Sequence, residues 1–167
     1  SDVCSSDLAK DLSLKAETGG MDAEAGIALD AVDNIFILSD FLLDSEVTME
    51  ADSDADGTGR FDIAASKTLD TQNNDLNIQA SDFKVDGSID ASGKELTLTL
   101  QDLEDGKQSI GLGLADKDVD IDNAELANIS ANNLVIGGDE NANIVVDGVA
   151  QENVANIAKV TLIANTE

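Results

Sequence analysis

A short apolar pattern returns along this chain at a nearly fixed interval. The residues at 39–41, 43, 44 and 47 are echoed by similar residues at 81–83, 85, 86 and 89, always 42 positions later, which reads as two turns of 21. Ile89 and Ile110 are 21 positions apart, and Leu112 and Leu134 are 22 apart. Intervals of this size, built from strands and turns, are typical of solenoids in which each repeat stacks on its neighbour. The pattern therefore constrains the architecture, but it does not indicate a catalytic or binding site.

Short alternating segments accompany this interval. Residues 95–100 place Leu96, Leu98 and Leu100 on one face of a strand and Thr97 and Thr99 on the other. Comparable segments lie at 12–14, 27–29, 35–38, 47–49, 76–78, 83–85, 110–114, 119–121, 134–136, 144–146 and 160–163. Asp, Asn, Gly and Ser turns separate them, which an antiparallel sandwich or barrel would also allow. Because similar residues return at equivalent places, we expect an all-β fold, a parallel β-solenoid of roughly seven coils of about 20–25 residues.

Two segments have helical composition when taken in isolation. Residues 20–32 are rich in Ala, Asp and Glu, and residues 123–129 carry apolar side chains at helical spacing. Strand signals flank the second segment closely on both sides, so we expect it to be a turn within a coil. Turn residues are spread evenly along the chain, which predicts a single domain.

The composition excludes several classes of function. Nine basic against 35 acidic residues give a formal net charge of −26, which repels nucleic acids and anionic membrane surfaces. The chain has no His, the commonest general base, and no Trp or Tyr to stack on sugars. A pair of carboxylates for glycoside hydrolysis stays open, because so many acids always offer pairs. We expect no enzyme.

One acidic stretch has the spacing of a cation site. Asp52, Asp54 and Asp56 alternate and are followed by Gly57, as at the start of an EF-hand loop. The decisive twelfth position, which should be Glu, is Ile63, and the ninth is Arg60. We therefore expect an exposed turn, with a looser Ca²⁺ site formed by the three aspartates as the alternative. We expect no other cofactor.

An ordered block of motifs resembles a family of bacterial exoproteins. The motifs stand at 55–59, 74–78, 86–89, 109–113, 122–129, 133–138, 143–146 and 160–164. In this order they are similar to modules of filamentous-haemagglutinin-like proteins, large repetitive adhesins exported by two-partner secretion or autotransport. Residues 1–8 (SDVCSSDL) instead resemble a translated sequencing-library adapter. We therefore interpret them as a non-native tail, with a metagenomic fragment starting near Ala9.

The resemblance implies a right-handed parallel β-helix over residues 9–167. It also implies a secreted protein at the bacterial cell surface, in which this segment is a stalk that projects an adhesive or effector region. The expected partners are neighbouring coils of the parent protein, and host or biofilm glycans or proteins. Two alternatives stay open: a Ca²⁺- or glycan-binding adhesive segment, and a fragment of a β-helical polysaccharide-degrading enzyme.

Overall fold

The computed structural model describes residues 10–23, 26–101, 103 and 106–165, and within them the fold is all-β with two short helical segments. The predicted tail at residues 1–8 and the predicted start at Ala9 lie outside the described residues. The strands are β1 (Leu12–Leu14), β2 (Met21–Ala23), β3 (Ile27–Asp30), β4 (Ile35–Ile37), β5 (Phe41–Leu43), β6 (Val47–Glu50), β7 (Arg60–Ile63), β8 (Thr68–Asp70), β9 (Leu76–Ala80), β10 (Asp82–Val85), β11 (Ser88–Leu100), β12 (Ile110–Gly113), β13 (Val119–Asp122), β14 (Ile129–Gly137), β15 (Ile144–Asp147) and β16 (Val160–Ile163). The helical segments are α1 (Asn123–Ala127) and the 3₁₀ turn η1 (Gln151–Val154). No helix among the described residues is long and apolar enough to cross a membrane.

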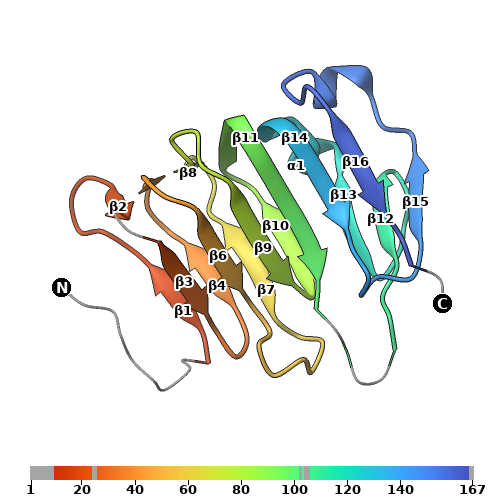
Figure 1. The fold of residues 1–167 in the computed structure, drawn as a ribbon, viewed down its shortest axis with the longest axis horizontal. Helices are drawn as coiled ribbons and strands as arrows, with labels where there is room; N and C mark the ends of the chain where they lie inside the picture. The colour runs from red at the N-terminus through yellow and green to blue at the C-terminus, as the bar shows by residue number, and fades with distance from the viewer. Residues whose placement is uncertain (1–9, 24–25, 102, 104–105, 166–167) are drawn as a thin grey trace.

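Every strand pair within the described residues is parallel, and in the first half each strand pairs with the one three elements later. One sheet has the order β1-β4-β7-β10. A second sheet has two arms, β2-β5-β8 and β3-β6-β9, which meet at β11. Figure 1 shows the strands side by side along the long axis, from β1 at one end to β15 and β16 at the other. This confirms the all-β, parallel part of the expected fold.

The long strand β11 joins the two arms. Its first part pairs with β8 and its second part with β9, and its pairing with β14 shifts register between Ala91 and Glu95. Gly93 lies in this interruption, where a Cβ would collide with the side chain of Asn73. A residue without a side chain is therefore needed where the strand bends past a neighbouring turn.

The core consists of apolar side chains stacked in register. Ile35 and Phe61 are paired neighbours in the first sheet, and Leu69 and Ile89 are paired neighbours in the second. Each of the four is at most 1% exposed. The predicted alternation in β11 is confirmed, because Leu96, Leu98 and Leu100 are buried and Thr97 and Thr99 are half-buried. Burial of one such Leu or Ile contributes about 1.5–3 kcal/mol to folding.

The repeat interval is less regular than the sequence suggests. Paired strands are offset by 20 residues between β2 and β5, but by 28 between β5 and β8. The longer turn at residues 51–59 accounts for most of this difference. In consequence, residues 42 positions apart in the sequence do not occupy equivalent places in the structure. Phe41 stacks on Leu69 in the second sheet, whereas Phe83 stacks on Phe61 in the first.

The strand order changes after β10. β13 lies beside β10, and β12 pairs with both β13 and β15, giving the order β13-β12-β15. Residues 114–118 alone connect the parallel neighbours β12 and β13. Gly111 permits this short return, because a Cβ there would collide with the backbone oxygen of Ala115 and the carboxylate of Asp120.

The segment at 123–129 is partly helical, so the expectation of a turn is wrong there. Asp122 accepts hydrogen bonds from the amides of Ala124 (2.7 Å) and Glu125 (2.9 Å), and Glu125 accepts one from the Asp122 amide (3.0 Å). This reciprocal capping box satisfies the first free amides of α1. The helical composition at 20–32 is not realised, because β2 and β3 occupy that segment.

Candidate functional site

The turn between β6 and β7 brings together the three aspartates that the sequence singled out. Carboxylate oxygens of Asp52, Asp54 and Asp56 all lie within 4.8 Å of one another. Asp54 and Asp56 are exposed, whereas Asp52 is fully buried, which the expectation of an exposed turn did not foresee. Asp52 has a left-handed backbone (φ 66°) and passes tightly under Gly59, where a Cβ would collide with Asp52.

Asp52 holds the turn together. Its carboxylate accepts hydrogen bonds from the amides of Asp56 and Gly57, both at 3.0 Å, and from the buried hydroxyl of Ser81. Burial raises the pKa of Asp52, and these three donors oppose the rise. Ser81 directly precedes β10, so the carboxylate ties the turn to a strand 29 residues later.

Asp56 has a local role of the same kind. One of its oxygens accepts from both the amide (3.0 Å) and the hydroxyl (2.6 Å) of Thr58. The hydroxyl contact is the main cause that lowers the pKa of Asp56. The spacing of the three carboxylates suits Ca²⁺, whose oxygen ligands lie at about 2.3–2.6 Å. Ca²⁺ needs about six to eight oxygens, however, and two of the three carboxylates already serve the turn. Binding of Ca²⁺ here stays a prediction.

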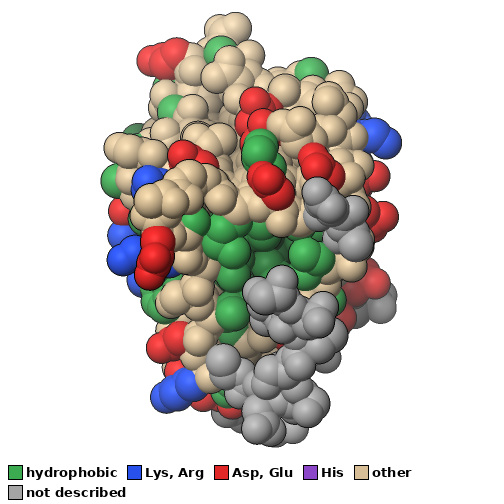
Figure 2. Space-filling view, turned by 90° about the vertical axis from the view of Figure 1, so that its left-hand side faces the viewer, with side chains coloured by type: hydrophobic (Ala, Val, Ile, Leu, Met, Phe, Trp, Pro, Cys, Tyr) green, Lys and Arg blue, Asp and Glu red, His purple; other side chains and the backbone are tan. Residues whose placement is uncertain are grey.

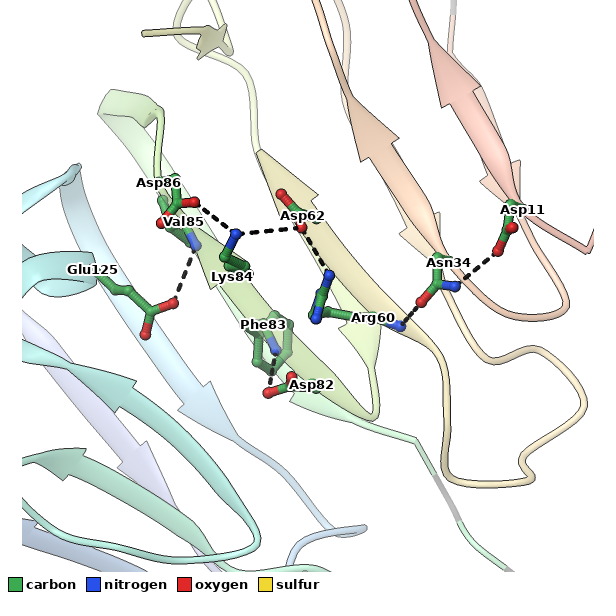
Figure 3. A network of polar contacts seen from close by, with 10 residues as sticks. All are labelled: Asp11, Asn34, Arg60, Asp62, Asp82, Phe83, Lys84, Val85, Asp86 and Glu125. Carbon is green, nitrogen blue, oxygen red and sulfur yellow. Dashed lines mark hydrogen bonds and ion pairs between the residues drawn. The ribbon is translucent and has the colours of Figure 1, made fainter. Parts of the chain in front are cut away.

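A second polar group lies on the outward face of β7 and β10 (Figure 3). We call Arg60, Asp62, Asp82 and Lys84 the polar strip. The parallel register places Arg60 beside Asp82 and Asp62 beside Lys84, so each cation has an acid as its neighbour. Arg60 contacts Asp62 at 3.0 Å, and Lys84 lies 3.9 Å from Asp62 and 2.7 Å from Asp86. Such partly exposed pairs contribute little stability each, but they offset repulsion between stacked acids.

The polar strip continues toward β1 through an amide. The Asn34 side chain donates to Asp11 (2.8 Å) and accepts from the backbone amide of Arg60 (2.9 Å). Figure 3 shows these contacts crossing successive strands. The interactions therefore run along the stack, linking one strand to the next.

Two carboxyl groups are desolvated, that of Asp82 within the polar strip and that of Glu125 beside it. Burial is the main cause that raises the pKa of both Asp82 and Glu125. A raised carboxyl pKa is what a general acid needs. Both oxygens of Glu125 are nevertheless occupied by backbone amides, those of Val85 (3.2 Å) and Asp122 (3.0 Å), and Asp82 accepts from the Phe83 amide (2.9 Å). These contacts organise the backbone.

A polar groove of about 260 Å³ lies at the corner after β7 and β10. It is lined by Ser66, Lys67, Thr68, Asp86, Gly87, Ser88 and Asn128. Within it the hydroxyls of Thr68 and Ser88 pair at 3.1 Å, and Asn128 donates to the Val85 carbonyl at 2.7 Å. Three of its polar side chains are thus already engaged in contacts between successive segments of the stack.

Sequence reasoning found the Asp52 turn but missed the polar strip. The signal was short, because β7 alternates polar and apolar residues over only four positions, Arg60 to Ile63. Comparisons with protein-family models, with curated proteins and with solved structures found no match to this chain. The resemblance to filamentous-haemagglutinin-like exoproteins therefore stays a prediction that rests on the quoted motifs.

Proposed function

We propose that residues 9–167 form roughly seven coils of a right-handed parallel β-helix, a stalk segment of a secreted bacterial surface adhesin. In this proposal the segment has no enzymatic activity. It holds an adhesive or effector region away from the cell, and its partners are the neighbouring coils of the parent protein. Neither nucleic acid nor a membrane is a partner.

One observation supports the stalk proposal most directly. Each of the early strands pairs in parallel with the strand three elements later, so equivalent positions are repeated along one axis. The polar contacts also run along this axis, from Asp11 through Asn34 to Arg60. A stack of repeats in which each repeat contacts only its neighbours changes mainly in length when a repeat is added or removed.

Deletion of one complete repeat tests the proposal. Val47 pairs with Leu76, 29 positions later, so removing residues 47–75 places β9 next to β3 in register. The deletion also removes Asp52, so the variant carries Ser81→Ala to avoid an unpaired buried hydroxyl. Spin labels at Ser13 and Val145, which face outward at the two ends, report the length, with Cys4→Ser in the background. We expect the label distance to fall by about 4.8 Å, one strand spacing.

A second deletion is the matched control. Removing residues 47–67 takes away 21 residues, the interval read from the sequence, and places β8 where β6 belongs. Because those strands belong to different arms, we expect this variant not to fold. A folded 21-residue deletion, or a 29-residue deletion that unfolds or keeps its full length, would contradict the proposal.

A second candidate function is Ca²⁺ binding by an adhesive segment. The convergence of Asp52, Asp54 and Asp56 within 4.8 Å favours it. A ligand that binds only the folded state raises its stability according to its concentration and affinity. The test is a thermal melt with and without millimolar Ca²⁺, on the parent and on an Asp54→Asn variant. A rise in melting temperature that the variant loses supports the site, whereas no rise in the parent refutes it.

A further inference from the structure

The stacked apolar columns of the core can be followed to the two ends of the described stack. Within the stack, inward side chains such as Ile35, Leu69 and Leu134 are fully buried. Some terminal members of the same columns are more exposed, although they are equally apolar. Leu14, Ala23 and Leu29 on the first three strands are buried, so each end leaves only part of the core cross-section open.

At the N-terminal end, three strands offer such incomplete columns. Leu12, Met21 and Ile27 are partly exposed. Their register partners one strand inward are Ile35, Phe41 and Val47, which are at most 4% exposed. Figure 2 looks onto this end and shows hydrophobic side chains gathered near its centre, with charged and polar groups above them and to their left.

At the C-terminal end, β15 and β16 are the outermost strands. Val146, Val160 and Leu162 are 52%, 44% and 42% exposed, whereas their register partners Leu112, Leu134 and Ile136 are at most 4% exposed. Between these two strands a cavity of about 160 Å³ reaches into the core. It is lined by Leu112, Leu126, Leu134, Ile136, Val146, Val149, Val154, Val160 and Leu162.

The backbone at the two ends is complementary. The outer edges of β1, β2 and β3 at one end, and of β15 and β16 at the other, have no strand partner among the described residues. All pairing in the stack is parallel, so both sets of edges run in the same direction. A copy of the chain translated along the stack axis would continue the ladders as they run inside the molecule. Unpaired edges of this kind are templates for strand addition.

We propose that a second copy of this chain docks head to tail, its β1–β3 end against the β15–β16 end of the first. Joining two identical ends would instead require antiparallel strands, which the stack does not use. A heterologous contact leaves one end of each kind free, so it propagates into open chains of molecules. The inference rests on the stacking of the proposed stalk, and it places a second copy of residues 9–167 where that proposal places neighbouring coils of the parent protein. The repeat deletion tests length within one molecule and does not depend on association.

Charge sets the conditions for this association. With a net charge of −26, two copies repel one another. Salt shortens the range of that repulsion, to about 10 Å at 0.1 M and about 3 Å at 1 M. Apolar burial is unaffected by such screening. We therefore expect association to become stronger as NaCl is raised, the opposite of an interface held by ion pairs.

The test uses sedimentation velocity on the full chain and on one charged variant for each end. Ile27→Lys alters the N-terminal end and Leu162→Lys the C-terminal end, with Met21→Lys and Val160→Lys as replacements if circular dichroism shows either variant unfolded. Leu42→Lys is the matched control, because Leu42 is 37% exposed but lies on the outward side of β5. We expect the parent and the control to form dimers and larger species with concentration and salt. Each end variant should be monomeric.

Mixing the two end variants is decisive. Each retains one intact end of the opposite kind, so an equimolar mixture should form a one-to-one dimer and nothing larger. A parent that stays monomeric at about 1 mM in high salt refutes the proposal. So does an N-terminal-end variant that still dimerises, which indicates an interface between identical ends. End variants that associate as the parent does place the interface on another face and also refute it.

Discussion

Replacement of the buried carboxylate at Asp52 should destabilise the fold strongly. Asp52 is fully buried, has a φ of 66°, and accepts hydrogen bonds from two backbone amides and from Ser81. Asp52→Ala removes all three acceptor interactions at once. It also places an alanine in the left-handed region, which suits Asp better than Ala.

The magnitude follows from these contacts. Ser81 is 3% exposed, so its hydroxyl would be left unpaired at a cost of about 1–3 kcal/mol. The left-handed alanine adds about 1–2 kcal/mol. The two amides lie in a partly exposed turn, where water replaces much of what they lose. The small loss at these amides and the release of a desolvated charge act in opposite directions, so the total stays at about 2–5 kcal/mol in the free energy of unfolding.

Urea unfolding at neutral pH, followed by far-ultraviolet circular dichroism, measures this loss. Asp54→Ala is the control, because the exposed Asp54 should change stability by no more than about 0.5 kcal/mol. A double-mutant cycle with Ser81→Ala should give a coupling of about 0.5–3 kcal/mol between the two residues. Equal effects of Asp52→Ala and Asp54→Ala, or a coupling of zero, would refute the assigned role of Asp52.

Three further outcomes are expected. Since burial raises the carboxyl pKa of Asp82 and Glu125, the folded state takes up protons before the unfolded state as pH falls. Unfolding free energy should therefore rise as pH falls from 7 toward the ordinary carboxyl range of about 4, and urea titrations of an Asp82→Asn/Glu125→Gln variant should show a smaller rise. Gly111→Ala should lower the melting temperature sharply, because its Cβ meets a backbone oxygen, whereas Gly138→Ala meets only an ordinary contact at 3.5 Å and should be neutral; equal melting temperatures would contradict the assigned packing. Leu98→Ala, at a position 1% exposed, should cost about 2–5 kcal/mol in urea unfolding, and a cost below about 1 kcal/mol would mean that the column is not closely packed there.

The sequence predicted those parts of the fold in which one strand carries its own alternation. β11 has three leucines at every second position, and β9 and β12 show the same alternation on a smaller scale. The capping box of α1 was also readable, since Asp122 stands three residues before Glu125. The segment was expected to be a turn because strand signals flank it closely on both sides.

Other features depend on contacts that no local pattern contains. Asp62 is 9% exposed in the middle of β7, and its charge is offset by Arg60 and Lys84 from the same and the next strand. The burial of Asp52 depends on Ser81, far along the chain. The offset between paired strands varies because turns such as 51–59 differ in length, so a fixed interval could not give the register.

The displaced strand β12 has a consequence for how the chain folds. Up to β10, each strand meets a partner made about 20–29 residues earlier, so the structure can grow in the order of synthesis. In the chain β12 comes before β13, yet the strand that lies beside β10 in the native structure is β13. Both strands carry two inward apolar residues two positions apart, so they compete for one edge. We expect a slow refolding phase in which β12 leaves the position beside β10 so that β13 can take it. Stopped-flow traces without a slow phase would refute this competition.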